Sequence, residues 1–200
     1  FAQAGQQAGF AINPDFNGAE QEGVGPYQVT HKNGERYSAA KAYLTPNLSR
    51  PNLHVITDAH TTRILLEKKR AVGVEYHQGG EFKQLKAARE VILSAGAFQS
   101  PQILMLSGIG AKELLLHAGV GLQHELPGVG QNLHDHPDVV IGVNAPSAKD
   151  LFGISPTGLA RTVKGIFEWR NHRSGMLTTN FAEAGGFIKS SPDEAIPDLQ

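Results

Sequence analysis

Apolar and polar positions change their spacing several times along this chain, and each change predicts a new element. Residues 62–67 and 71–77 read TRILLE and AVGVEYH, which are short runs rich in β-branched and long apolar side chains. A third run, EFKQLKA at 81–87, follows a Gly-Gly pair. LHVITDA at 53–59 is a fourth run of this kind. Short β-rich runs separated by turn residues predict an antiparallel meander over these four segments.

Other segments carry a hairpin pattern or a helical one. YQVTHKNGERYS at 27–38 predicts a hairpin, because its Asn-Gly pair at 33–34 is a strong two-residue turn signal. Helical spacing of apolar residues predicts helices over 101–107, 111–119 and 157–172. The remaining strand predictions are 138–144, which reads DVVIGVN, and a return to β structure within 176–190.

The stretch SAGAFQSPQILMLSGIG at 94–110 follows an unalternated apolar run, REVILSA at 89–95. Such a run predicts a strand covered on both faces, as in a parallel sheet. Pro101 at the first helical position and Ser100 as its cap predict a helix directly after the bend. A bend with almost no side chains lets a ligand approach the main chain, and a helix amino end favours phosphate. A tight turn without any ligand explains the same residues equally well.

Composition narrows the class of protein. The chain has 200 residues, a net charge of −1 and 40% hydrophobic residues, which suits a globular protein and argues against a nucleic-acid partner. It contains no cysteine, so disulfides and thiolate chemistry are excluded. No apolar run approaches the roughly 18 residues of a membrane span, and no signal peptide is visible. The mix of elements predicts an α/β fold with added antiparallel strands.

The run LPGVGQNLHDHP at 126–137 raises the possibility of a metal site. His134, Asp135 and His136 carry ligating groups, and a third ligand would have to come from His117, His124 or a distant carboxylate. The glycine-rich lead-in and Pro137 instead predict a loop, in which Asn132 and Asp135 side chains cap the backbone. The loop interpretation is favoured over the metal site.

Two further functions, a hydrolase and a substrate pocket, are compared with purely structural roles of the same residues. A Ser-His-Asp hydrolase requires a G-x-S-x-G elbow, and SGIG at 107–110 has the wrong order. TTNFAEAGGF at 178–187 could line a substrate pocket with Glu183 facing inward, but a strand with a bulge at its Gly-Gly pair is the simpler interpretation. No dinucleotide fingerprint follows a strand, and no P-loop is present.

REVILSAGAFQSPQILMLSGIG at 89–110 resembles the second signature of the glucose–methanol–choline (GMC) flavoprotein oxidoreductases. The strings NGERYSAAKAYL, RPNLHVITDAHTTRIL, LPGVGQNLHDHP and TTNFAEAGGFIKS agree with that family in order and spacing, so the resemblance covers nearly the whole chain. The nearest branches are bacterial choline dehydrogenases and aliphatic alcohol dehydrogenases. WRNHRSGMLTTNFAEAGGF favours the alcohol branch.

The resemblance implies both fold and activity. Residues 1–137 would be part of a Rossmann-like FAD-binding domain with a β-meander, and residues 138–200 would begin a substrate domain with an antiparallel sheet. The enzyme would oxidise the CH–OH group of choline or an aliphatic alcohol to an aldehyde, passing a hydride to the flavin of FAD. An electron acceptor, quinone or oxygen, would then reoxidise the flavin.

The resemblance also implies which residues contact the cofactor and the substrate. The bend at 94–97 would lie beside the FAD ribose and diphosphate, and the main chain of Thr61 would meet the adenine edge. Residues near 132–137 would lie close to the flavin, and two residues of the later sheet would face the substrate. The cofactor residues are Thr61, Ser94, Ala95, Gly96, Ala97, Ser100, Pro101, Asn132, Asp135, His136 and Pro137, and the substrate residues are Asn180 and Glu183.

Several family features have no counterpart in this sequence. The glycine fingerprint and the catalytic histidine of the family are not found, so no catalytic and no metal-binding residue is predicted here. We expect the segment alone to bind FAD weakly, to lack turnover and to self-associate. The resemblance implies a bacterial-type location, either cytoplasmic or peripherally associated with a membrane. The alternative is a non-catalytic fragment or binding module that holds no flavin.

Overall fold

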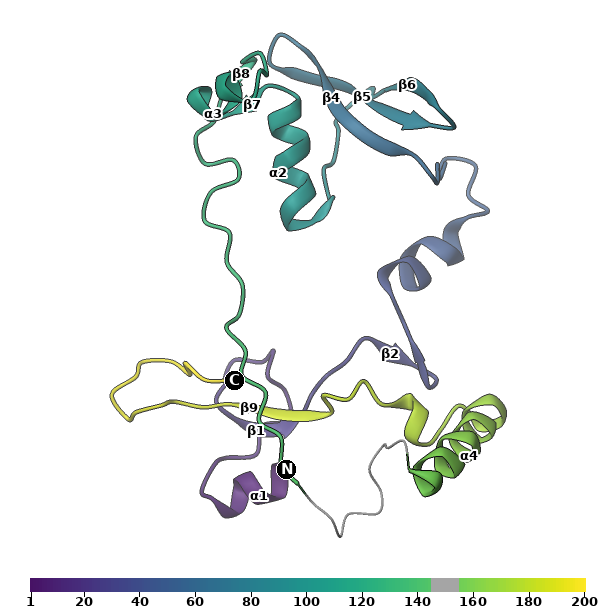
Figure 1. Cartoon of the computed structure of the whole chain (residues 1–200), viewed down its shortest axis with the longest axis vertical. Coiled ribbons are helices and arrows are strands. Elements are labelled where there is room, and N and C mark those ends of the chain that lie inside the picture. The colour runs from purple at the N-terminus through teal and green to yellow at the C-terminus, as the bar shows by residue number, and fades with distance from the viewer. Residues whose placement is uncertain (145–154) are drawn as a thin grey trace. The chain divides into compact units, whose positions relative to one another are not determined.

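The computed structural model describes residues 1–144 and 155–200, and its contacts divide the chain into two compact units. One unit comprises residues 1–53 and 144–200, and the other comprises residues 54–143. Figure 1 labels the elements of both units. The predicted domain boundary near residue 138 stays a prediction, and part of the stretch that follows it lies outside the described residues.

A three-stranded antiparallel meander forms the centre of the unit at 54–143. Its strands are β4 (His60–Glu67), β5 (Arg70–Gln78) and β6 (Glu81–Lys86), in the order β4-β5-β6. Ile64 of β4 pairs with Val74 of β5, which pairs in turn with Leu85 of β6. The predicted meander is confirmed for the runs at 62–67, 71–77 and 81–87, but the run at 53–59 forms no strand, because no described strand pairs with it.

Helix α2 (Gly96–Leu106) packs against β4. The predicted start at Pro101 is wrong, because the helix begins five residues earlier and Pro101 lies inside it. Ser100 does not cap the helix. Its hydroxyl accepts a hydrogen bond of 3.0 Å from the Ala95 N–H. Ser100 lies in the second turn of α2, so this bond ties the bend at 94–97 back onto the helix. Small residues that read as loop in the sequence therefore form the opening turn of the helix.

Two predicted strands are absent from the described residues. Residues 91–94 run between turns without a pairing partner, and Ile92 is 79% exposed. Residues 138–144 are also unpaired, and Val140 is 89% exposed. An apolar run forms a strand only where a neighbour supplies the ladder hydrogen bonds, and no described strand lies beside either run.

A small parallel pair completes this unit. Strands β7 (Ile109–Gly110) and β8 (His124–Glu125) pair in parallel, and α3 (Lys112–His117) connects them. Leu115 of α3 is the most deeply buried large side chain described, with 1% exposed. The predicted helix over 111–119 is confirmed, and it ends before Gly119, whose φ is +72°.

The other unit is organised around a short antiparallel pair. Strand β1 (Gly23–Pro26) pairs with β9 (Ala184–Phe187), beside the short helix α1 (Ala2–Gln7). The Phe16 ring lies between the rings of Tyr27 and Phe187, with centroids 5.6 and 5.2 Å away. Gly185 is required here, because a Cβ at that position would collide with the Tyr27 ring. The β structure predicted within 176–190 is confirmed for 184–187, while Met176–Thr178 forms a 3₁₀ turn.

A hairpin and a long helix meet in the same unit. Strands β2 (His31–Lys32) and β3 (Glu35–Arg36) form the predicted hairpin, which a π-helical turn (Ala40–Leu44) and a 3₁₀ turn (Thr45–Asn47) follow. Helix α4 (Pro156–His172) confirms the prediction over 157–172. The Trp169 indole N–H donates a hydrogen bond of 2.7 Å to the Gly34 carbonyl, which fastens the hairpin to the helix.

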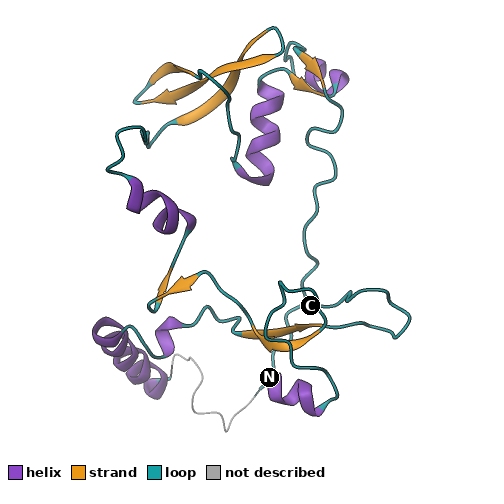
Figure 2. Ribbon diagram, turned by 180° about the vertical axis from the view of Figure 1, so that it is seen from behind, coloured by secondary structure: helices purple, strands orange, loops and turns teal. Residues whose placement is uncertain are grey.

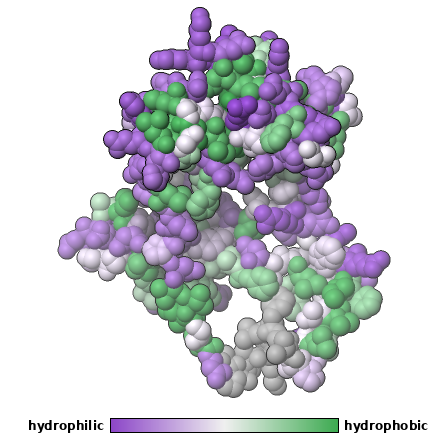
Figure 3. Space-filling view, turned by 45° about the horizontal axis from the view of Figure 1, so that its top comes forward, coloured by the Kyte–Doolittle hydropathy of each residue, from purple (hydrophilic) through white to green (hydrophobic). Residues whose placement is uncertain are grey.

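Long connecting segments separate these elements, as Figure 2 shows. Buried apolar side chains are few, and many large apolar side chains are exposed, including Phe98 (74%) and Phe167 (62%). Figure 3 shows such apolar side chains gathered in patches among polar ones. Across the described residues, no helix is both long enough and apolar enough to cross a bilayer.

Candidate functional site

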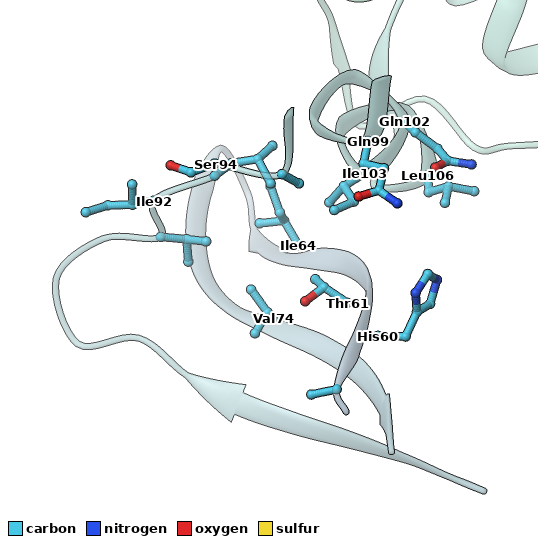
Figure 4. A pocket seen from close by; sticks show the side chains of 14 residues that line it. His60, Thr61, Ile64, Val74, Ile92, Ser94, Gln99, Gln102, Ile103 and Leu106 are labelled. Carbon is cyan, nitrogen blue, oxygen red and sulfur yellow. The ribbon is translucent and has the colours of Figure 1, made fainter. Parts of the chain in front are cut away.

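A cavity of about 530 Å³ lies in the unit at 54–143, between the meander, α2 and the unpaired segment 91–95 that leads into α2. Ile64 and Val74 line it from the sheet, and Ile103 and Leu106 line it from the helix. Figure 4 shows these side chains together with His60, Thr61, Ser94, Gln99 and Gln102. The cavity thus joins an apolar wall to a polar rim.

The bend at 94–97 forms one edge of this cavity. Gly96 has a φ of +86°, and a Cβ built at that position would have no atom within 4 Å. The space beside the main chain is therefore open. Glycine is needed here because of the positive φ, and not because a side chain would collide with a neighbour. No side chain caps the amino end of α2, so its first amides are not held by a side chain.

A buried hydroxyl connects the two walls of the cavity. Ser107 Oγ accepts a hydrogen bond of 2.8 Å from the Ile64 N–H of β4 and donates one of 2.6 Å to the Ile103 carbonyl of α2. Ser107 is only 7% exposed. On the same sheet, Arg63 and Glu75 form an ion pair of 2.8 Å, which lowers the pKa of Glu75 and raises that of Arg63.

The predicted cofactor residues divide into two groups in the structure. Thr61, Ser94 and Ala95 line the cavity together, although 33 positions separate the first two in sequence. The next residues along the chain, which open α2, are Gly96, Ala97, Ser100 and Pro101.

The second group lies on the exposed segment after residue 130. Asn132 has a positive φ of 56°, and the His136 N–H donates a hydrogen bond of 2.8 Å to Asp135 Oδ1. Neither these residues nor Pro137 line the cavity, so the structure does not bring the two groups together. The capping interaction of Asp135 agrees with the loop interpretation of this stretch.

Sequence reasoning missed the polar residues on the rim of the cavity. His60 precedes Thr61 on β4, and Gln99 and Gln102 lie one turn apart on α2, facing the same cavity. Residues three positions apart on a helix lie on the same face, so this spacing could have indicated that the two glutamines act together. The prediction that the helix begins only at residue 101 placed Gln99 outside the helix and hid this spacing.

A larger cavity of about 910 Å³ lies in the other unit, between the β2–β3 hairpin and the residues that follow α4. Asn180, one of the two predicted substrate residues, lines this cavity. Glu183 does not, and its carbonyl accepts a hydrogen bond of 2.9 Å from the Tyr27 N–H. The cavity is lined by Gln28, Val29, Thr30, His31, Gly34, Glu35, Arg36, Trp169, Leu177, Thr178, Thr179, Asn180 and Phe181.

Glu35, which lines this larger cavity, takes part in two ion pairs. Glu35 pairs with Lys41 and, at 2.8 Å, with Arg173. These two cations hold the pKa of Glu35 below its usual value of 4.5, with Lys41 the larger cause. The Arg173 guanidinium also lies 4.3 Å from the centre of the Trp169 ring. Among the described residues, no group of three or more His, Asp or Glu side chains could hold a metal ion.

The family of the chain follows from its sequence. Residues 1–138 match the GMC oxidoreductase family, so the chain belongs to that family. Over its full length it is 48% identical to an alcohol dehydrogenase [acceptor] of Pseudomonas putida and 42% identical to an oxygen-dependent choline dehydrogenase of Brucella ovis. The chain spans 36% of the length of each of these relatives.

Solved structures share the fold. An FAD-dependent oxidoreductase from Chaetomium thermophilum superposes with a TM-score of 0.79 at 27% identity, over 92% of this chain and 33% of that one. A formate oxidase superposes with the same TM-score at 28% identity, over 92% of this chain and 32% of that one. The described elements therefore belong to a mixed helix-and-sheet fold that flavoprotein oxidoreductases use.

Proposed function

We propose that this chain is a segment of an FAD-dependent oxidoreductase that converts the CH–OH group of an alcohol to an aldehyde. The observation that carries the proposal is the cavity beside residues 94–97. Residues predicted from family resemblance to contact one cofactor, Thr61, Ser94 and Ala95, line the same cavity. Membership of the GMC family and the names of the relatives support the same activity.

The residues around the cavity suit the adenosine-diphosphate half of FAD. Apolar side chains such as Ile64 and Ile103 offer a surface for a flat base, and the main chain of Thr61 offers hydrogen-bonding groups at its edge. The open, left-handed bend at Gly96 allows phosphate oxygens to approach the main chain closely. The uncapped amino end of α2, 11 residues long, adds a positive partial charge for the diphosphate.

FAD, when bound, supplies the hydride acceptor of the reaction. The residues of this chain hold the cofactor rather than perform the proton transfer. Ser94 and the amides from Gly96 onward orient the ribose and diphosphate, and Asn132, Asp135, His136 and Pro137 contact the flavin side. Asn180 faces the alcohol from the cavity that it lines, and Glu183, which lies outside that cavity, is proposed as a substrate residue from the family resemblance alone. The base that removes the hydroxyl proton lies in another part of the protein.

The remaining parts of the proposal concern partners and location. The electron acceptor is a quinone or oxygen, in line with relatives that are named for an unspecified acceptor or for oxygen. Residues 1–137 contribute to the FAD domain and residues 138–200 begin the substrate domain. The protein acts in the cytoplasm or at a membrane surface, and the isolated segment self-associates through its exposed apolar side chains.

The test uses the intact flavoprotein that contains this chain. Under anaerobic conditions, an alcohol substrate should bleach the flavin absorbance, and the corresponding aldehyde should form in an equal amount. If no alcohol bleaches the flavin, the proposed activity is contradicted.

A substitution in the bend tests the cofactor site separately. Gly96→Ala forces a side chain into the left-handed region, which costs roughly 1–2 kcal/mol. Flavin affinity should therefore fall by about tenfold if binding requires that conformation. Gly128→Ala is the matched control, since an added Cβ there also meets no atom within 4 Å and its φ is not in that region. Equal flavin retention by the two variants would contradict the site.

A further inference from the structure

Ser100 makes a hydrogen bond that reaches backward along the chain. Its hydroxyl accepts the Ala95 N–H at 3.0 Å, across five residues. Ala95 directly precedes the first turn of α2, and both bonded residues are half-buried, while Gly96 and Ala97 between them are exposed. A helical side chain that accepts from the amide just before its helix does what the glutamate of a capping box does.

The bend at 94–97 has little else to hold it. Residues 91–94 are unpaired, and Gly96 has a φ of +86° with no atom within 4 Å of a Cβ built there. Among the residues that the structure describes, Ser100 supplies the one side-chain hydrogen bond to the bend. Because glycine leaves the backbone free to adopt many conformations, this bond is the contact that restricts the bend.

The same bond determines which amides are available to a ligand. The Ala95 N–H already has its partner within the protein. The amides of Gly96 and Ala97, the first two of α2, come before the first hydrogen bond of the helix, and no side chain caps them. Ser100 does not line the cavity, although Ser94 and Ala95 do. The free donors are therefore the main-chain amides after Ala95.

Serine at position 100 does not favour the helix itself. Alanine is the better helix former, because a serine side chain competes for backbone hydrogen bonds. Replacing Ser100 with alanine would therefore stabilise α2 but leave the Ala95 N–H without this acceptor. The two effects have opposite signs, so a role in the bend can be measured separately from a role in the helix.

We infer that Ser100 is a positioning residue, which holds the bend so that the amides of Gly96 and Ala97 are in place for the diphosphate of the cofactor. The inference rests on the proposed function, because that function places the diphosphate beside the bend. It changes the role that the family resemblance implies for Ser100, from a cofactor contact to a residue that acts through the main chain.

The experiment measures FAD affinity of the intact protein after its flavin has been removed. Ser100→Ala should weaken FAD binding by about three- to tenfold, which is the usual effect of one lost hydrogen bond. Ser100→Thr keeps the hydroxyl and should restore FAD affinity to within about twofold of wild type. Ser49→Ala is the matched control and should change nothing, because Ser49 is exposed and makes no described side-chain hydrogen bond.

Two further measurements separate positioning from a general loss of structure. ADP carries the diphosphate and adenosine lacks it. Ser100→Ala should therefore weaken ADP binding by the same factor as FAD binding and leave adenosine binding unchanged. Hydrogen exchange over 94–98 should be faster in Ser100→Ala than in wild type, whereas a gain in helix propensity alone would make it slower.

The possible outcomes separate the inference from the proposed function. Unchanged FAD affinity in Ser100→Ala, or a loss that Ser100→Thr does not restore, would overturn the inference. An equal loss of ADP and adenosine affinity would overturn it as well, because the whole cavity would then be damaged, and so would slower exchange over 94–98. If the protein binds FAD but no alcohol bleaches the flavin, the proposed activity fails and the positioning role is unaffected.

Discussion

The hydrogen bonds of Ser107 join β4 to α2, which form the two walls of the cavity. Removing them is the sharpest test of whether this contact holds the two walls together. The Ile64 N–H has this hydroxyl as its partner, at 2.8 Å, and both residues are buried, with 8% and 7% exposed. Ser107→Ala removes the acceptor and leaves a buried N–H without one. An unsatisfied buried donor costs about 1–3 kcal/mol.

That free energy predicts a specific change in local stability. The equilibrium for opening β4 away from α2 should shift by a factor of about 5 to 150, since 1.4 kcal/mol is about tenfold. Hydrogen exchange of the intact protein, followed by mass spectrometry over the peptide containing Ile64, measures this shift directly. Exchange in β6, at the far edge of the meander, should change less than exchange in β4.

Ser49→Ala is the control for this experiment, because Ser49 is exposed and makes no described side-chain hydrogen bond. It should leave exchange in β4 unchanged. If Ser107→Ala also leaves the Ile64 peptide unchanged to within about twofold, the hydroxyl does not connect the two walls and the reasoning is refuted.

Two further predictions concern stability and pH. Leu115→Ala should lower the free energy of unfolding by about 2–5 kcal/mol, because Leu115 is 1% exposed. Leu116→Ala is the control and should have little effect, because Leu116 is 57% exposed. Equal shifts of the unfolding midpoint of the two variants in a urea titration would contradict this packing. The lowered pKa of Glu35 means that its ion pairs stabilise the hairpin fully above the usual value of 4.5 and are lost as the pH falls through the lowered value. Hydrogen exchange over 166–173 should therefore differ between wild type and Glu35→Gln at pH 6, and this difference should shrink progressively as the pH falls below 4.5. A difference that stays constant as the pH is lowered would count against the ion pairs.

Elements that are determined by residues close together in the sequence could be predicted from the sequence. The meander and the hairpin follow from β-rich runs broken by Gly-Gly and Asn-Gly pairs, and Asn33 and Gly34 both have the positive φ that a two-residue hairpin turn requires. The unpaired run at 89–95 shows the limit of this reasoning. Its apolar composition predicts a strand, but a strand also requires a partner, which composition does not supply.

Contacts between distant segments could not be predicted from the residues themselves. Thr61 and Ser94 were connected only through resemblance to a family, and the cavity that they share depends on how α2 packs on β4. The Trp169–Gly34 hydrogen bond joins residues 135 positions apart, and no local sequence pattern predicts it.

The most direct test of the account is an experimental structure of the intact flavoprotein with its cofactor bound. A diphosphate oxygen of FAD should lie at hydrogen-bonding distance, about 2.7–3.2 Å, from the main-chain nitrogen of Gly96 or Ala97. The adenine should lie beside the main chain of Thr61 in the same cavity. A bend occupied by protein side chains, with FAD bound elsewhere, would contradict the account.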